Sequence, residues 1–297
     1  MLNLAEIKSA ATQAGFDLCG VTKCQKLSTD REFLERWLAD GHGQGLDYLS
    51  RNIDKRADIS QLVEGAKTVI VCGVNYKNRY SEGYTPDCRQ KIASYALTTD
   101  YHTTIKQMLR QLCEALKQSC PTLSGRIFTD SAPVFEKRYA VEAGLGWIGR
   151  QSLLVTPQFG TFVLLGVAIV NEECDCYDSP LSSAGCGECR RCVDRCPNGA
   201  IIERHIDTRR CISRATIEPS PSGDTPLHGW IFGCDECQSC CPYNRHTPTY
   251  SNPLFTPTFD PLEVDWSAMI EEEFSMRFAT TPLSRSSASR ICKNKTE

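Results

Sequence analysis

The sequence lacks any apolar run long enough to cross a membrane. Its longest such stretch, residues 162–170, falls well short of the roughly 20 residues that a spanning helix needs, and it suits a buried strand. Behind Met1 there is no basic flank followed by a hydrophobic segment, which is the pattern of an export signal. We therefore expect a protein that stays in the cytoplasm and binds no membrane.

A strong excess of one charge is also missing. The 33 basic and 36 acidic side chains leave a net charge of −3, which is too small to predict a broad nucleic-acid groove or attraction to a membrane surface. One basic stretch stands out within this balance, and it contains Arg190, Arg191, Arg195, Arg204, Arg209, Arg210 and Arg214. These arginines can form either a solvated surface or a local patch for an anionic partner.

Cysteine, in contrast, is abundant, with 18 residues in 297 positions. A reducing compartment disfavours a disulfide framework. Eleven of the cysteines lie between Cys174 and Cys241, while the other seven are scattered singly. Scattered cysteines such as Cys72 and Cys113 are typical of small buried apolar positions. The dense group predicts a metal centre.

The spacing within the dense group is that of a bacterial ferredoxin. Three cysteines at two-residue gaps are followed, after three more residues, by a cysteine–proline pair, in Cys186-x2-Cys189-x2-Cys192-x3-Cys196-Pro197. Two-residue gaps let the chain curl around a cube-shaped 4Fe–4S cluster, and the cysteine before proline binds the other cluster. A second, imperfect copy follows at Cys234-x2-Cys237-x3-Cys241-Pro242, and Cys211 can supply its missing ligand.

The simplest complete assignment places four thiolates on each of two clusters. We expect cluster one to be held by Cys186, Cys189, Cys192 and Cys241, and cluster two by Cys196, Cys211, Cys234 and Cys237. Cys240 is left over and can replace Cys241 if the loop register differs. The alternative is two zinc sites of four cysteines each, for which this spacing is unusual. The pair Cys174 and Cys176 is too close together to match the cluster pattern, and we treat it as incidental.

Helical and strand patterns are mixed over residues 1–170. We expect helices over residues 4–14, 31–40, 101–119 and 131–142, and strands over residues 16–21, 68–74 and 125–129. Residues 152–156 and 161–170 flank a Pro-Gln-Phe-Gly turn and predict a hairpin. The sequence thus predicts an α+β fold, in which a mixed α/β core over residues 1–170 precedes a ferredoxin-like two-cluster module over 171–246. Residues 247–297 are expected to form a C-terminal extension that packs on the core and is helical around residues 266–278.

One further block of sequence carries a family resemblance. It runs Asp130-Ser-Ala-Pro-Val-Phe-Glu-Lys-Arg-Tyr-Ala-Val-Glu-Ala-Gly-Leu-Gly-Trp-Ile-Gly-Arg-Gln-Ser-Leu-Leu154. Together with Tyr95-Ala-x3-Asp100-Tyr101-His102, Arg210-Cys-Ile-Ser213 and Gly233-Cys-Asp-x-Cys237, it resembles the epoxyqueuosine reductases over residues 1 to about 290. That family is cobalamin-dependent, carries two 4Fe–4S clusters, and reduces epoxyqueuosine to queuosine at the wobble position of the tRNA anticodon.

The resemblance also implies a set of site residues. It predicts Asp130 as the proton donor, and a cobalamin site that includes Arg56, Tyr95, Asp130, Trp147, Ser152 and Leu154. The structural alternative for Asp130 is a carboxylate that caps a helix, and such a position favours the charged form of the carboxylate. His102 is not assigned as a cobalt ligand. The glycines between Gly144 and Gly149 are expected to allow close backbone approach to a flat cofactor.

The resemblance further implies partners and leaves alternatives open. We expect a monomer that acts on tRNA carrying epoxyqueuosine and receives electrons from a reduced ferredoxin, flavodoxin or similar donor. Longer members of the family end in a helical-repeat domain that helps to grip tRNA, and we expect this chain, whose last residue is Glu297, to be a short form without it. The competing interpretations are a corrinoid reductase of another substrate, such as an organohalide, and a non-catalytic ferredoxin-type electron carrier.

Overall fold

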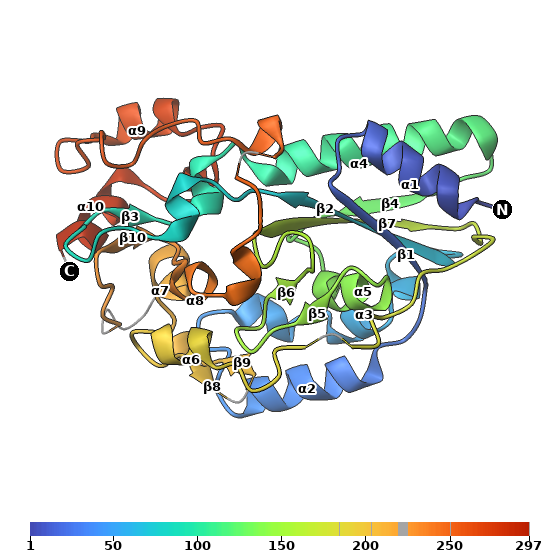
Figure 1. The fold of residues 1–297 in the computed structure, drawn as a ribbon, viewed down its shortest axis with the longest axis horizontal. Coiled ribbons are helices and arrows are strands. Elements are labelled where there is room, and N and C mark those ends of the chain that lie inside the picture. Colours follow the sequence, from blue (N-terminus) through green and yellow to red (C-terminus); the bar gives the residue numbers. More distant parts are fainter. Residues whose placement is uncertain (184, 203, 219–224, 250, 297) are drawn as a thin grey trace.

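The structure is a computed structural model, and it describes residues 1–183, 185–202, 204–218, 225–249 and 251–296. At its centre lies a four-stranded sheet in the order β1-β2-β7-β4 (Figure 1). These strands are β1 (Leu18–Lys23), β2 (Thr68–Asn75), β7 (Val163–Val170) and β4 (Gly125–Phe128). Every neighbouring pair runs antiparallel. The sheet is therefore held by long-range pairings that connect both ends of the first 170 residues.

Helices cover both faces of this sheet. Side chains alternate between faces along a strand, so in β2 Ile70 and Cys72 pack toward α1 (Leu4–Gln13) and α4 (Tyr101–Ser119), which bury Ile7, Leu109 and their neighbours. Val69 and Val71 point the other way, into a second core that contains Tyr139 of α5 (Glu136–Glu142). Figure 1 shows α1 and α4 on one side of the sheet and α5 on the other.

A third core joins distant parts of the chain. Strand β3 (Lys91–Ile92) pairs in parallel with β10 (Trp230–Phe232). Ile92 and Phe232 then pack with Trp266, with Phe274 of α9 (Glu271–Arg277) and with Ile291 of α10 (Ala288–Thr296). The predicted domain boundaries at residues 170 and 246 stay a prediction, but segments on both sides of each share this core.

The remaining elements are short and lie around the central sheet. They are α2 (Ser28–Ala39), α3 (Ile53–Ala57), β5 (Trp147–Ile148), β6 (Leu154–Val155), α6 (Arg191–Arg195), β8 (Ile201–Ile202), β9 (His205–Ile206), α7 (Ile212–Ile217) and α8 (Glu236–Ser239). Three 3-10 helices also matter below: η1 (Asp47–Ser50), η4 (Ser94–Leu97) and η8 (Pro282–Arg285). Within the described residues, no helix combines the length and apolarity that a bilayer crossing demands.

The predicted mixed fold is confirmed, and several elements differ in detail. The helix over residues 101–119 is as predicted. The hairpin is wrong: β6 pairs with β5, whereas β7 pairs with β2 and β4 as an inner strand of the sheet. The helix predicted from residue 131 begins only at Glu136, because residues 131–135 form turns. The helix expected around residues 266–278 likewise begins later, at Glu271.

Candidate active site and cluster-binding site

Asp130 lies immediately after the end of β4, in an unusual backbone conformation. Its φ angle is +58°, in the left-handed region that costs about 1 kcal/mol for a residue with a Cβ. The turn is held from both sides. Thr129 donates its hydroxyl to the carbonyl of Leu165 at 2.8 Å, and the Asp130 amide donates to Oε1 of Glu136 at 2.8 Å. The chain therefore fixes Asp130 through its own backbone as well as through its side chain.

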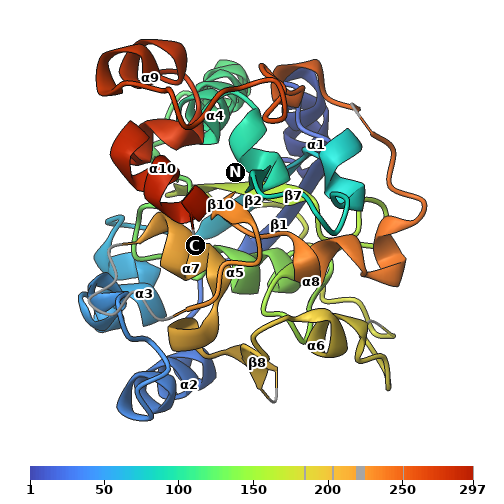
Figure 2. The same ribbon diagram turned by 90° about the vertical axis from the view of Figure 1, so that its left-hand side faces the viewer.

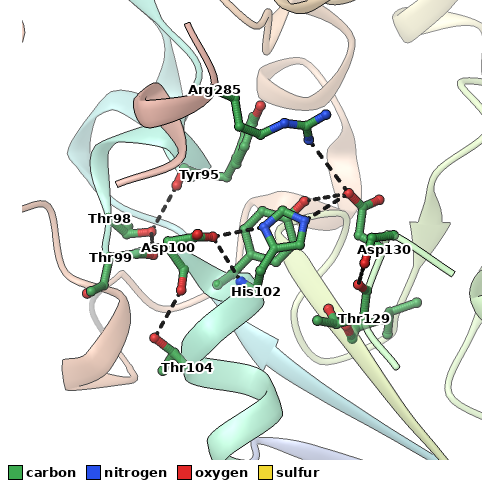
Figure 3. A network of polar contacts seen from close by, with 12 residues as sticks. Tyr95, Thr98, Thr99, Asp100, His102, Thr104, Thr129, Asp130 and Arg285 are labelled. Carbon is green, nitrogen blue, oxygen red and sulfur yellow. Dashed lines mark hydrogen bonds and ion pairs between the residues drawn. The ribbon is translucent and has the colours of Figure 1, made fainter. Parts of the chain in front are cut away.

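The Asp130 carboxylate accepts two hydrogen bonds from the start of α4. Its Oδ2 lies 3.0 Å from the hydroxyl of Tyr101 and 3.2 Å from Nε2 of His102. The other ring nitrogen of His102, Nδ1, lies 2.8 Å from Oδ1 of Asp100, so the imidazole bridges two carboxylates (Figure 3). Arg285 of η8 approaches the same Oδ2 at 4.0 Å. The side chain of Asp130 is nevertheless 53% exposed, which leaves it open to a ligand.

These contacts shift the two titratable groups in opposite directions. Burial tends to raise the pKa of Asp130, but hydrogen bonds from His102 and Tyr101, with the charges of His102 and Arg285, outweigh it and lower the pKa. The hydrogen bond to Asp130 raises the pKa of His102, aided by Asp100 and opposed by burial. Both shifts favour the charged form of their group, so the contact between the Asp130 carboxylate and the His102 imidazole stabilises the protonated ring.

Two further groups border the Asp130 turn. Burial, aided by the charge of Asp130, raises the pKa of Glu136 to about 8, so this carboxyl is largely neutral at pH 7. Arg56 of α3 lies with its guanidinium 5.8 Å from the ring centre of Phe135, and burial is the main reason why its pKa is lowered. The exposed carboxylate of Asp130 thus lies among the cationic Arg285, the largely neutral Glu136 and the anionic Asp100.

The predicted cobalamin residues fall into two groups. Tyr95 of η4 and Asp130 lie near each other, since the charges of Asp130 and Arg285 act on the partly buried Tyr95. Arg56 borders the same region, because the charge of Glu136 acts on its guanidinium. The other three lie on or between β5 and β6: Trp147 faces Val155 across the pairing, Ser152 has φ +62°, and the side chain of Leu154 is buried in the core. Lys137 links Ser152 to the first group: it donates a hydrogen bond to the Ser152 carbonyl, and the charge of Asp130 acts on its ammonium group.

Sequence reasoning missed several residues of this site. Glu136 stands six positions after Asp130 in the quoted block, and Tyr101 directly precedes His102, so the signal was present but carried no assigned role. Arg285 is separated from Asp130 by 155 positions, and no local pattern could have joined them. The tertiary fold alone brings η8 to the end of β4.

The eight predicted cluster ligands separate into two neighbouring groups. Burial, aided by the nearby Cys186, Cys192 and Cys189, raises the pKa of Cys241 to about 11, so these four thiols lie close together. In the second group, Cys237 lies beside Cys234 and Cys211, and Cys211 lies beside Cys196. Cys237 of the second group also lies close enough to Cys192 of the first for the two thiols to interact electrostatically, so the two groups of cysteines are neighbours. The leftover thiol, Cys240, lies beside Cys192 and Cys241.

The donors present fit the cofactors that the sequence suggests. Crowded thiolates repel one another unless a cationic centre binds them, and iron–sulfur clusters do this. The amide of Ala200 donates to Sγ of Cys196 at 3.2 Å, the kind of bond that stabilises a ligating sulfur. Among the described residues, no three His, Cys, Asp or Glu side chains converge as the ligands of one metal ion do.

Buried donors without partners mark the region predicted for the corrin. Within the described residues, Nε of Arg56, Nε1 of Trp147 and Nε of Arg150 are buried without a hydrogen-bond partner. Buried donors of this kind are normally satisfied, and the amide-rich rim of a corrinoid can accept from them.

The glycines between residues 144 and 149 are required by the packing of the protein itself, while their close approach to a flat cofactor stays a prediction. A Cβ on Gly146 would stand 2.1 Å from the carbonyl oxygen of Val155, and one on Gly144 would stand 2.6 Å from that of Ser179. A Cβ on Gly149 would stand 2.4 Å from the side-chain oxygen of Gln151. Packing within the protein itself therefore requires these glycines, independently of any flat cofactor.

Comparison with known proteins agrees with this arrangement. The family described as "Epoxyqueuosine reductase QueG, DUF1730" matches residues 56–131, and that described as "4Fe-4S double cluster binding domain" matches residues 185–244. The second match confirms the two-cluster module predicted from the cysteine spacing. The epoxyqueuosine reductase of Cyclobacterium marinum is 38% identical over 286 residues, which cover 94% of this chain and 91% of that protein.

Solved structures are similar over nearly the whole chain. Epoxyqueuosine reductase from Streptococcus thermophilus has a TM-score of 0.85 at 26% identity, covering 98% of this chain and 79% of that one. An epoxyqueuosine reductase crystallised with an epoxyqueuosine-modified tRNA-Tyr stem loop has a TM-score of 0.86 at 25% identity, with the same coverage. The sequence relatives, the family match and the shared architecture agree, and the chain belongs to the epoxyqueuosine reductase family.

Proposed function

We propose that this protein reduces epoxyqueuosine to queuosine in the anticodon of tRNA, using cobalamin and two 4Fe–4S clusters. The observation that carries the proposal is the exposed Asp130 carboxylate, hydrogen-bonded to His102 and Tyr101 in a chain whose relatives are epoxyqueuosine reductases. A tRNA substrate places the reaction in the cytoplasm. A reduced ferredoxin, flavodoxin or similar carrier supplies the electrons to a monomer.

The reaction needs more than amino-acid side chains can supply. Conversion of an epoxide to an alkene and water consumes two electrons and two protons, and the bound cobalamin and clusters would supply the electrons at the required potential. Arg56 and Trp147 would donate hydrogen bonds to the corrin rim, because each has a buried donor without a protein partner. The eight cysteines of the two groups described above would hold the clusters.

The protein's own contribution at the reacting oxygen is a proton. Opening the epoxide develops negative charge on oxygen, and an acid within hydrogen-bond reach typically contributes ~10²–10⁴-fold to the rate. Asp130 is the acid in this proposal, and His102 supplies its proton across the 3.2 Å contact. The low pKa of Asp130 in the open site opposes this role. Covering its exposed carboxyl with cofactor and substrate favours the neutral form by removing water.

The basic stretch of the sequence contributes only part of its arginines to a tRNA surface. Arg214 is 7% exposed and is therefore buried, and Arg209 is held by both carboxylate oxygens of Asp207 at 2.8 Å. The arginines from Arg190 to Arg214 therefore do not form one continuous exposed surface. Arg56 and Arg285 flank Asp130 and are better placed to receive the phosphates of an anticodon loop.

The test is a single-turnover assay under anaerobic conditions. The protein is reconstituted with iron, sulfide and cobalamin, reduced chemically, and mixed with tRNA that carries epoxyqueuosine. Mass spectrometry of the digested tRNA then reports whether the nucleoside loses one oxygen atom. Formation of queuosine supports the proposal. Binding of cobalamin without product would favour a corrinoid reductase of another substrate, and failure to bind cobalamin would favour a simple electron carrier.

A further inference from the structure

A depression of about 510 Å³ lies beside the thiols predicted to hold cluster one. Its walls come from α6, from the end of α8 and from the chain just beyond it, and the lining residues are Arg191, Asp194, Arg195, Ser239, Cys240, Cys241 and Arg245. Cys241 is a predicted ligand of cluster one, and Cys240 is its sequence neighbour. The depression therefore brings the solvent to the edge of the cluster-binding thiols, at a point where an electron could enter.

The rim of this depression is positively charged. Arg191, Arg195 and Arg245 are all exposed. The guanidinium of Arg195 pairs with Glu236 at 2.8 Å, and Asp194 lies 3.9 Å from Arg190. Arg191 and Arg245 have no acidic side chain within 4.0 Å in the part of the chain that the structure describes. The rim thus carries a surplus of positive charge in a protein whose net charge is −3.

The elements that carry this surface lie apart from those that carry Arg56 and Arg285 beside the Asp130 site. Figure 2 shows α6 and α8 on one side of the molecule and α3 and α10 on the other. Arg56 belongs to α3, and Arg285 lies in η8 just before α10; both flank Asp130. A protein bound over α6 would therefore leave the substrate side free, so that electron delivery and tRNA binding need not compete.

We propose that Arg191, Arg195 and Arg245, around Cys240 and Cys241, form the docking surface for an acidic one-electron carrier protein. The proposal rests on the proposed function, which requires two electrons in each turnover. At each docking event the carrier is oxidised by one electron and the protein is reduced by one, so two events serve one epoxide. Complementary charge would act mainly on the association rate, which long-range attraction can raise by ~10–10³-fold at low salt.

The test uses charge reversal on the reconstituted full-length protein. The double variant Arg191→Glu/Arg245→Glu reverses the two arginines that lack an acidic partner. Its matched control is Lys67→Glu/Arg110→Glu, which makes the same change of charge at exposed positions before β2 and on α4. The probe is a strongly acidic flavodoxin in its reduced form, and stopped-flow absorbance follows reduction of the clusters in the absence of tRNA over a series of salt concentrations.

We expect the Arg191→Glu/Arg245→Glu variant to be reduced at least tenfold more slowly than the wild type at low salt, with a flattened salt dependence. The control should stay within about twofold of the wild type. Iron content and reduction by dithionite, which needs no docking, should be unchanged. Reduction by flavodoxin at the wild-type rate would overturn the proposal, and so would a loss of tRNA affinity instead of a loss of electron transfer. A wild type that takes electrons from flavodoxin in this salt-sensitive way but leaves epoxyqueuosine unchanged would refute the function and leave the docking surface intact.

Discussion

At the scale of the residue, the chemistry depends on the protonation states of Asp130 and His102. The carboxylate accepts from Tyr101 and His102, and the resulting pKa shifts run downward for Asp130 and upward for His102. A helix-capping carboxylate would not need this arrangement. The nearest helix, α5, begins six residues later at Glu136 with no side-chain cap, so the capping alternative for Asp130 is wrong.

Replacement of Asp130 tests its chemical role. Asp130→Asn preserves the shape of the side chain but cannot deliver a proton to the epoxide oxygen. We expect turnover of epoxyqueuosine tRNA to fall by ~10²–10⁴-fold, while the contents of iron and cobalamin stay at wild-type levels. Single-turnover assays on the reconstituted variant measure this. Unimpaired turnover would remove Asp130 from the mechanism.

The pH profile tests the contribution of His102. Because the pair supplies a proton, the rate should fall as the pH rises through the raised pKa of His102, above its ordinary value of 6.5. In His102→Gln the proton rests on Asp130 alone, whose ordinary pKa is 3.8, so the alkaline fall in rate should move to lower pH. Single-turnover rates across pH measure the shift. An unchanged alkaline limb would show that His102 does not hold the transferred proton.

Glu136 is predicted to be a positioning residue. It accepts the Asp130 amide at 2.8 Å, and because its pKa is raised to about 8, glutamine mimics its neutral form. Glu136→Ala should lower the turnover rate about tenfold or more with little change in KM, since small misplacement of a reacting group is costly. Glu136→Gln should restore a rate near that of the wild type. If both variants are equally impaired, the carboxyl itself is needed and the positioning role is wrong.

At the scale of the element, local patterns predicted the helices better than the strand pairings. The apolar spacing over residues 101–119 predicts a helix whose bounds the structure confirms, because α4 buries a continuous stripe that includes Ile105, Leu109 and Leu112. The predicted hairpin is correct only at its turn, where Thr156 and Gly160 form an isolated bridge. Beyond that bridge, β7 finds longer partners in β2 and β4, and no local signal specifies them.

The two-cluster module could be predicted because its cysteine spacing is a local feature of the sequence, and the family match over residues 185–244 confirms it, while the ligand set of each cluster stays a prediction. The motif from Cys186 to Cys196 lies on and around α6, and the thiol of Cys241 after α8 does lie beside Cys186, Cys189 and Cys192. The corrin contacts were harder to predict from local patterns, because the predicted residues come from α3, η4, the end of β4 and the β5–β6 pair, which are far apart in the sequence. Their assignment stays a prediction.

Two neighbouring cysteines test the cluster assignment. Cys241→Ser should remove one ligand of cluster one and lower the iron content from about eight toward four per chain. Cys240→Ser should keep about eight, because Cys240 is the leftover thiol. Iron analysis and electron paramagnetic resonance of the reduced proteins measure both. If Cys240→Ser loses iron and Cys241→Ser does not, the loop register is the alternative one.

At the scale of the whole molecule, the two proposals together give electrons a route from one part of the chain to another. The proposed docking surface lies beside the thiols predicted to hold cluster one, at α6 and α8. The two groups of thiols are neighbours through Cys192 and Cys237, and the exposed carboxylate of Asp130 lies near α3 and η8. A core that joins β3, β10, α9 and α10 fixes these parts relative to one another. The proposals thus predict that a protein of small net charge binds an acidic carrier and a polyanionic substrate at separate surfaces.

The most direct measurement is a single turnover with the wild-type protein, after anaerobic reconstitution with iron, sulfide and cobalamin and reduction by dithionite. We predict about eight irons and one cobalt per chain, and conversion of epoxyqueuosine in tRNA to queuosine in proportion to the cobalt bound. Zinc in place of iron in anaerobically purified protein, or fully loaded protein that leaves the epoxide intact, would contradict the account.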